Sequence, residues 1–279
     1  PVLDLDSAEA PDAPLLHDHL FTKGLPEKPE RPSNVAAVLE LSRGDVDAAF
    51  AEAEVVVERV YHTPTVHQGY IEPHACVARW GQDDQALVWC STQGAFDVRS
   101  MTARVLGVNV SHLKVIPSEI GGGFGGKTTV YLEPVAVLLS RRSGRPVKLT
   151  MSREDVFRAT GPASAARVRV RLGARRDGTL VAAEAELAYE AGAFAGSPMG
   201  PGAMCVLAPY DLPAFRIRAK DVVVNKPKVA AYRAPGAPQA LFATESAMDE
   251  LAHTLGIDPI ELRLRNAADE GTQATYGPK

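Results

Sequence analysis

The chain has 279 residues, 46% of them hydrophobic and 23% charged, so it can bury a substantial core as one large domain or two small ones. The formal net charge is -4 and the basic residues are scattered, which argues against a nucleic-acid partner or an anionic membrane surface. No apolar run approaches the roughly 20 residues that span a bilayer, and the acidic amino terminus lacks the zones of a signal peptide. We therefore expect a cytoplasmic protein with no membrane partner.

Three zones are expected along the chain. Residues 1–44 are predicted to be an extended lead-in or linker, because residues 1–32 are rich in Pro, Asp and Glu and show no sustained apolar period. Residues 45–267 are predicted to form the folded domain, with possible lobes at 45–165 and 166–267, and residues 268–279 form a tail.

Hydrophobic periodicity predicts a mixture of strands and helices in the domain. Strands are predicted over residues 75–80, 86–90, 113–116, 147–150 and 168–172, and helices over residues 45–53, 98–106, 130–140 and 240–255. Residues 175–178 are predicted to form a hairpin turn, Gly256 closes the longest helix, and a further helix starts at Pro259 and ends near Asn266. This mixture predicts an α+β fold with mixed sheets and packed helices in two lobes.

The cysteines give no sign of a metal site. Cys76, Cys90 and Cys205 are odd in number and widely spaced, without the paired spacing of a zinc or iron-sulfur site. The histidines also lack a regular ligand spacing. We therefore predict buried thiols and no direct protein ligand to a metal.

The most informative segment runs from Gly121 to Thr128, with five glycines in its first six positions. Glycine lets the backbone turn its amides toward a ligand, which predicts a binding loop for anionic or electron-rich oxygens. The segment also fits the P-loop pattern G-x-x-x-x-G-K-S/T, so a P-loop-type nucleotide-binding module is a rival interpretation. Against it, no later apolar strand ends in an Asp that could hold magnesium. A third interpretation is that the glycines only permit close packing.

A second segment places Arg233 in a Pro- and Gly-rich turn that runs into the helix predicted over residues 240–255. The turn fixes the path of the backbone, and the guanidinium group offers a permanent set of donors for a carboxylate, phosphate or carbonyl. Taken alone, the segment also fits an ordinary helix entry with a solvated arginine.

Several motifs occur together in one order along the chain. They are Glu72-Pro73-His74, Ser91-Thr92-Gln93, the glycine loop with Lys127, Tyr232-Arg233-Ala234-Pro235-Gly236 and Met248-Asp249-Glu250. In this order and spacing, the chain resembles the molybdenum-binding subunit of the xanthine dehydrogenase/aldehyde oxidase family over about residues 34–266. This joint match is more specific than any single motif, and it favours a use of the glycine loop other than nucleotide hydrolysis.

The resemblance implies molybdopterin as the cofactor of the complete enzyme, with the cytosine dinucleotide form as one alternative. Gln93 would hydrogen-bond an oxygen ligand of molybdenum, the glycine-loop backbone would lie against the cofactor, and Arg233 would line its pocket. Pterin sulfurs hold the metal in this family, which agrees with the lack of protein ligands. The cofactor-binding residues implied in this way are Gln93, Gly122, Gly123, Phe124, Gly125 and Arg233.

Four positions of the implied substrate pocket depart from the family pattern. Thr128 stands where purine-oxidising members have glutamate, Pro201 where they have arginine, and Pro235 where they have phenylalanine. Ala234 stands where the carbon monoxide branch has cysteine. The resemblance therefore implies an aldehyde or aromatic N-heterocycle as substrate, without the usual purine contacts.

By the same resemblance, the whole enzyme hydroxylates its substrate with oxygen from water and passes electrons to 2Fe-2S and FAD groups on partner subunits or domains. The general-base glutamate of the family is expected in a downstream half of the molybdenum subunit. We therefore expect this chain to be an incomplete fragment that is inactive and binds no cofactor by itself. A noncatalytic assembly subunit that scaffolds partners is a further alternative.

Overall fold

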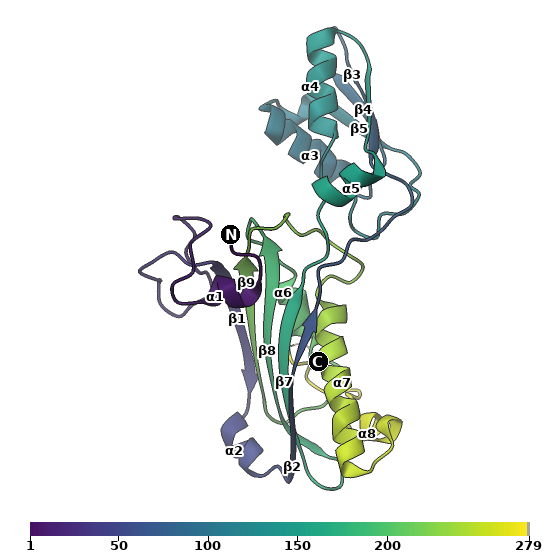
Figure 1. The fold of residues 1–279 in the computed structure, drawn as a ribbon. Coiled ribbons are helices and arrows are strands. Elements are labelled where there is room, and N and C mark those ends of the chain that lie inside the picture. The colour runs from purple at the N-terminus through teal and green to yellow at the C-terminus, as the bar shows by residue number, and fades with distance from the viewer. Residues whose placement is uncertain (278–279) are drawn as a thin grey trace. The chain divides into compact units, whose positions relative to one another are not determined.

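The computed structural model describes residues 1–277 and separates into two compact units. Unit 1 consists of Pro1–Thr65, Ser164–Val229 and Ala234–Lys279, and unit 2 of Val66–Ala163 and Ala230–Arg233. These units differ from two consecutive lobes, because strands before and after unit 2 in the sequence pair within one sheet of unit 1 (Figure 1).

Unit 1 is built on a five-stranded mixed sheet of order β1-β9-β8-β7-β2. Its neighbouring strands are antiparallel except β8 and β9, which are parallel. The strands are β1 (Val35–Arg43), β2 (Val55–Thr63), β7 (Ala166–Ala174), β8 (Leu180–Gly192) and β9 (Phe215–Val223). The helices of the unit are α1 (Leu5–Glu9), α2 (Val46–Ala51), α6 (Met199–Cys205), α7 (Ala237–Leu255) and α8 (Pro259–Asn266).

The core of unit 1 lies between this sheet and the helices α6 and α7 (Figure 1). Along β7, apolar residues such as Val168 and Val170 are buried while the alternating arginines point to the other face, as the sequence pattern predicts. Small residues of α7 at helical spacing, including Ala240, Ala243 and Ala247, let this helix pack closely against the strands. The predicted turn at residues 175–178 joins β7 to β8, and Gly256 ends α7 with φ +67°.

Part of the predicted lead-in is folded into unit 1. β1 lies in residues 1–44 and pairs with β9 along its length. Val2, just before the short helix α1, and Leu5, its first residue, are buried in a cluster with Val222 and Val224. These contacts could not be predicted from the acidic and proline-rich composition, because they depend on a few apolar residues that show no periodicity. Of the predicted tail 268–279, residues 278–279 lie outside the described residues.

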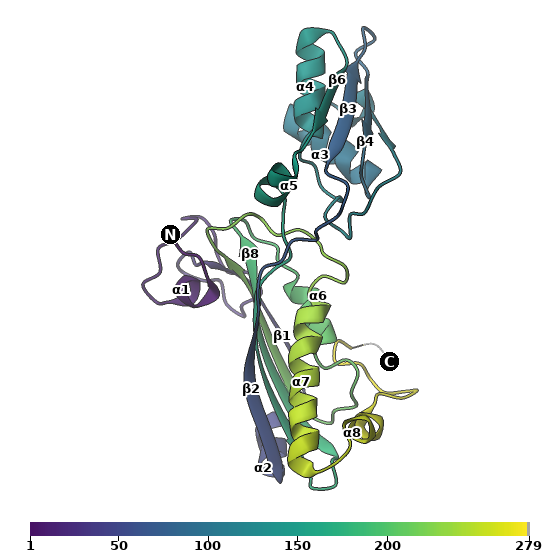
Figure 2. The same cartoon turned by 45° about the vertical axis from the view of Figure 1, so that its right-hand side comes forward.

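Unit 2 is built on a four-stranded mixed sheet of order β5-β4-β3-β6, in which only β4 and β5 are parallel. Helices α3 and α4 pack on one face of this sheet, around buried residues such as Val88, Val98 and Val137 (Figure 2). The strands are β3 (Ala75–Trp80), β4 (Ala86–Cys90), β5 (Leu113–Pro117) and β6 (Val147–Thr150). The helices are α3 (Ala95–Leu106), the 3-10 turn η1 (Val110–His112), α4 (Glu133–Ser143) and α5 (Arg153–Ala159).

The prediction of an α+β fold with mixed sheets is confirmed, and most predicted elements are present within a few residues. The predicted helix over residues 130–140 begins at Glu133 instead, because the Glu133 carboxylate accepts the Tyr131 N–H and Pro134 occupies the first turn. β8 and β9 were not predicted. The alanine-rich sequence of β8 lacks strand propensity, and its pairing with strands on both sides determines its conformation. Within the described residues, no helix has the length and apolar character to cross a membrane.

Candidate functional site

The glycine loop follows β5 in unit 2 and takes a path that side chains would obstruct. Gly122 and Gly125 have φ +91° and +99°, and Phe124 between them has φ +51°. A Cβ atom on Gly123 would lie 2.5 Å from Gln93 Oε1, and one on Gly125 would lie 2.9 Å from the Ala231 carbonyl oxygen. The glycines are therefore needed both for backbone conformation and for the close approach of two other segments.

Gln93 lies just after β4 and is held by the glycine loop. Its Oε1 accepts hydrogen bonds from the N–H groups of Gly125 at 2.8 Å and Lys127 at 3.3 Å. Its own N–H donates to the Lys127 carbonyl at 2.9 Å. The side chain is exposed, and its Nε2 has no hydrogen-bond acceptor in the described part of the chain. Since the carboxamide oxygen is engaged, the group presents its NH₂ as a donor.

The segment that contains Arg233 returns to the same loop. The Arg233 N–H donates to the Phe124 carbonyl at 2.9 Å, and Gln68 Nε2 donates to the Ala231 carbonyl at 2.8 Å. The Arg233 side chain is exposed and forms no ion pair among residues 1–277. The structure thus brings Gln93, the glycine loop and the Arg233 backbone together in unit 2, although Gln93 and Arg233 are far apart in the sequence.

A P-loop lysine would face the open side of the loop, but Lys127 points away from it. Its side chain is 0% exposed, and its Nζ lies 2.7 Å from both Glu72 Oε2 and Ser91 Oγ. The next helix starts only at Glu133, so the loop also lacks the helix that directly follows a P-loop. This geometry disfavours the P-loop interpretation.

A polar and aromatic cluster beneath the loop was missed by sequence reasoning. Tyr70 and His74 are buried, and Tyr70 Oη lies 2.7 Å from His74 Nε2. Burial, together with the Lys127 charge, lowers the pKa of His74 to about 4, so this imidazole is neutral at physiological pH. Burial raises the pKa of Glu72, but hydrogen bonds from Lys127, the Gly121 N–H and Ser91 outweigh it and hold the pKa below its usual value. The Glu72-Pro73-His74 motif was the available signal.

The four predicted substrate-pocket residues belong to different units. Thr128 lies in unit 2, where its Oγ1 donates to the Gly125 carbonyl at 2.9 Å. Pro201 in α6, Ala234 and Pro235 lie in unit 1, and Ala234 has φ +57°. Within unit 1, α6 contacts the turn before α7, since a Cβ atom on Gly236 would lie 2.4 Å from the Pro198 carbonyl oxygen.

The cysteines are buried or partly buried, as predicted. Cys76 and Cys90 face each other across β3 and β4, and burial raises the pKa of each thiol to about 12. They are therefore packing residues and not nucleophiles. Residues 1–277 contain no group of three or more His, Cys, Asp or Glu side chains arranged to hold a metal ion.

Residues 27–267 match the molybdopterin cofactor-binding domain family. The chain belongs to this family. It is 34% identical over 88% of its length to the nicotinate dehydrogenase large molybdopterin subunit of Eubacterium barkeri, and the match covers 58% of that subunit. It is 32% identical over 98% of its length to the probable hypoxanthine oxidase XdhD of Escherichia coli K12, and the match covers 31% of that protein.

The solved structure of the aldehyde oxidoreductase from Desulfovibrio gigas has the same fold. The TM-score is 0.89 at 30% sequence identity, over 99% of this chain and 30% of that protein. The chain thus spans less than two thirds of each of these three proteins. The relatives are oxidoreductases of the xanthine dehydrogenase and aldehyde oxidase type, as the sequence motifs predict.

Proposed function

We propose that this chain supplies one wall of the molybdopterin site of a molybdenum hydroxylase that acts on an aldehyde or aromatic N-heterocycle. The observation that carries the proposal is the convergence of Gln93, the glycine loop and the Arg233 segment in unit 2. Family membership supports the cofactor. The names of the relatives refer to hypoxanthine, nicotinate and aldehydes, and the last two suggest the substrate class for this chain.

The residues present fit such a cofactor. The N–H groups of Gly122, Gly123 and Phe124 have no acceptor in the described part of the chain, although Gly123 is buried. Together with Gln93 Nε2, they form a set of donors suited to electron-rich oxygens, and Arg233 adds a positive charge. The bound cofactor would supply Lewis acidity and redox chemistry. This chain's residues would bind and orient it without ligating the metal.

The finer features of the complete enzyme are part of the same proposal. Thr128, Pro201, Ala234 and Pro235 offer small or apolar groups to a substrate, which suits an uncharged aldehyde or heteroaromatic ring better than a purine held by ion pairs. The rest of the molybdenum subunit would supply the general-base glutamate and the other wall of the site. Iron-sulfur and FAD groups on partner subunits would accept the electrons, in the cytoplasm. The pterin is proposed as molybdopterin or its cytosine dinucleotide form.

Metal analysis tests the proposal. The isolated chain, purified from cells that make the cofactor, is expected to contain no molybdenum and to have no hydroxylase activity, because half of a cofactor cleft loses many contacts. The same chain joined to the rest of its subunit is expected to contain near-stoichiometric molybdenum. Stoichiometric metal in the isolated chain would refute the fragment proposal, and no metal in the complete subunit would favour a scaffolding role instead.

A substitution at Gln93 tests the site within the complete enzyme. Gln93→Ala is expected to lower kcat by about 10- to 100-fold and to change KM little, because a donor to the reacting centre acts mainly as charge develops. Gln93→Glu is the size-matched second variant, since it keeps the size of the side chain and removes the NH₂ donor, and it is also expected to lower kcat. An unchanged kcat in both variants would contradict the assigned role.

A further inference from the structure

A group of three residues, two buried and one partly exposed, connects the segments that form the site. Glu72, Ser91 and Lys127, called the brace below, come from three separate sequence motifs. Glu72 Oε2 accepts hydrogen bonds from Lys127 Nζ at 2.7 Å and Ser91 Oγ at 2.9 Å. Lys127 Nζ also lies 2.7 Å from Ser91 Oγ. Each member therefore contacts both of the others.

The brace holds both ends of the glycine loop. At the start of the loop, the Gly121 N–H donates to Glu72 Oε2 at 2.9 Å, and the Glu72 N–H donates to the Gly121 carbonyl at 3.1 Å. At its end, Lys127 is attached to the same carboxylate oxygen. One side-chain oxygen thus fixes the separation of two loop positions.

The backbone of Lys127 also controls Gln93. Its N–H donates to Gln93 Oε1, and its carbonyl accepts from the Gln93 N–H and from Thr92 Oγ1. The Lys127 ammonium lies 5.0 Å from the centre of the Tyr70 ring. A Cβ atom on Gly126 would lie 2.9 Å from that ring, so the loop rests directly on the tyrosine. A shift of Lys127 would therefore reach the Gln93 carboxamide through two backbone contacts.

Stability alone does not explain why Lys127 is buried at this place. Taking its ammonium group out of water costs about as much free energy as the attraction to the partly exposed Glu72 returns, and an apolar residue of similar volume often serves as well. A charged pair does impose direction, because each hydrogen bond is satisfied in only one arrangement. We therefore infer that the ion pair is present because it fixes the geometry of the loop, although its desolvation costs free energy.

We propose that Glu72, Ser91 and Lys127 are positioning residues that lock the glycine loop and turn the NH₂ group of Gln93 outward as a donor. That the donor faces a molybdenum cofactor rests on the function proposed above. The locking itself is a property of this chain. It gives the lysine of the glycine motif a role directed inward, toward Glu72, and not toward a ligand.

The first experiment is NMR spectroscopy on this chain labelled with ¹⁵N, in which the Gln93 NH₂ and the Gly125 N–H report on the site directly. Glu72→Gln keeps the shape of the carboxyl group and removes its charge, and Lys127→Met removes the ammonium group. Val137→Ala is the matched control, because Val137 is 0% exposed in the core of the same unit and is not part of the brace.

Both brace variants are expected to speed exchange of the Gly125 N–H with solvent at least about tenfold more than Val137→Ala does. The Gln93 NH₂ signals are expected to move toward those of a freely rotating carboxamide. Exchange no faster than in the control, or unchanged Gln93 signals, would overturn the proposal. If Lys127→Met does not fold, Glu72→Gln decides the question.

The unmodified chain gives an independent measurement. With ¹³C labelling added, the Gln93 NH₂ signals are expected to shift in acid at the same pH as the Glu72 carboxyl carbon. The same result is expected in His74→Gln, which removes the neighbouring group whose pKa is about 4. Independent titration of Gln93 and Glu72 would overturn the coupling. These measurements need no cofactor, so the proposed locking of the loop can fail or hold independently of the proposed molybdenum site. In an active complete enzyme, Glu72→Gln is expected to lower kcat about tenfold with KM changed less than about twofold, and an unchanged kcat would break the link to Gln93.

Discussion

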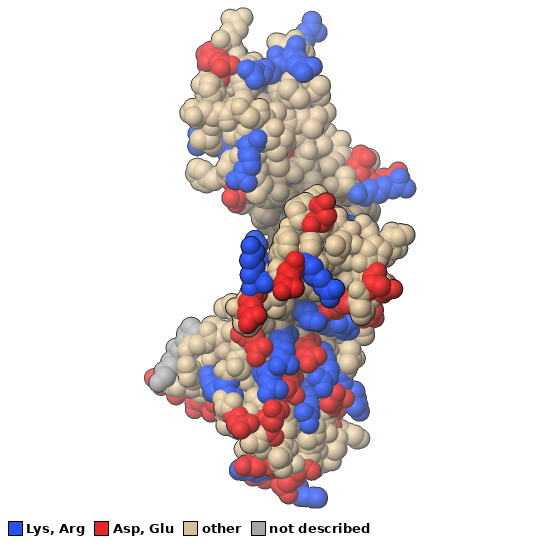
Figure 3. Space-filling view, turned by 90° about the vertical axis from the view of Figure 1, so that its left-hand side faces the viewer, with Lys and Arg blue, Asp and Glu red and all other residues tan. Residues whose placement is uncertain are grey.

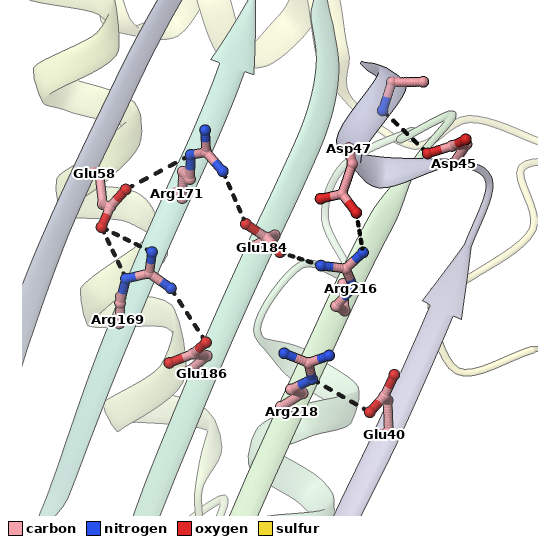
Figure 4. Close-up of polar contacts among 11 residues, drawn as sticks. Glu40, Asp45, Asp47, Glu58, Arg169, Arg171, Glu184, Glu186, Arg216 and Arg218 are labelled. Atoms are coloured by element: carbon pink, nitrogen blue, oxygen red, sulfur yellow. Dashed lines mark hydrogen bonds and ion pairs between the residues drawn. The ribbon is translucent and has the colours of Figure 1, made fainter. Parts of the chain in front are cut away.

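The two units use charged residues in opposite ways. On the sheet face of unit 1 opposite α6 and α7, called the open face below, α1 and α2 cover only part of the strands. Acidic and basic side chains there alternate across neighbouring strands and pair with one another (Figure 4). A space-filling view shows the two signs interspersed over the same face (Figure 3). In unit 2, the ion pair that connects the site motifs joins the fully buried Lys127 to the partly exposed Glu72. The same residue types thus line a solvated surface in one unit and fix a binding loop in the other.

The difference teaches where an ion pair affects structure. In unit 1, Arg218 and Glu40 are 51% and 55% exposed, so water screens their attraction and either could be lost at little cost. In unit 2, Lys127 is 0% exposed, and its only charged partner in the described residues is Glu72. Loss of that partner would leave an ammonium group buried without a counter-charge.

The largest expected effect is therefore on unit 2. Glu72→Gln is expected to lower its free energy of unfolding by about 2–3 kcal/mol, because it leaves the buried Lys127 ammonium group without a counter-charge. This is below the ~3–5 kcal/mol typical of fully buried pairs, since the Glu72 side chain is 35% exposed. Trp80 and Trp89, the two tryptophans of the chain, both lie in unit 2, so urea unfolding followed by tryptophan fluorescence measures this unit. A loss below about 0.5 kcal/mol would contradict the comparison.

The second expected effect is a pH dependence of unit 2. His74 has a pKa near 4 in the folded chain and an ordinary pKa near 6.5 when unfolded, so the unfolded state binds the extra proton between these values. The stability contribution is complete above pH 6.5 and is lost as the pH falls toward 4, by about 2 kcal/mol at pH 4.5. Tryptophan-detected unfolding from pH 7 to 4.5 measures this loss.

His74→Gln is the matched variant for this measurement, since it keeps a polar partner for Tyr70 and removes the titration. Its stability is expected to vary less with pH over the same range. Some slope is expected to remain, because burial and the Arg153 charge lower the pKa of His67 as well. Equal slopes in both proteins would show that His74 is not the titrating group.

The sequence predicted the site segments better than their connections. The glycine loop and Arg233 could be selected because glycine runs and rigid turns have local conformational causes, whereas Gln93 was selected only through the family resemblance. The inward direction of Lys127 could not, since it depends on Glu72, which lies 55 residues earlier in the chain. A lysine after a glycine run gives the same sequence pattern whether its side chain faces a ligand or the core.

The fold shows the same limit. The predicted strands over residues 75–80 and 86–90 match β3 and β4, because short apolar runs between turn residues are a local signal. β8 and β1 were missed as strands because pairing with neighbouring strands determines their conformation. β9 was missed although its apolar and charged residues alternate, which is a local strand signal. The division into units also depends on pairing between β2 and β7, which lie on either side of unit 2 in the sequence.

The smallest expected effects concern the open face of unit 1, and they separate its inner from its outer ion pairs. Glu184 is 14% exposed and contacts Arg171 at 3.2 Å and Arg216 at 2.9 Å, so Glu184→Gln is expected to cost unit 1 about 1 kcal/mol. Arg218→Gln is expected to cost less than about 0.5 kcal/mol, because solvent and salt already weaken that pair.

Hydrogen exchange of the β8 and β9 amides measures these two changes, since neither tryptophan lies in unit 1. The Glu184→Gln effect is expected to persist in 1 M salt, where the Debye length is only about 3 Å, and the Arg218→Gln effect to vanish. If the exposed pair cost as much as Glu184 and resisted salt, exposure to solvent would not weaken the ion pairs of this face. Position relative to solvent would then not be what separates the two kinds of ion pair.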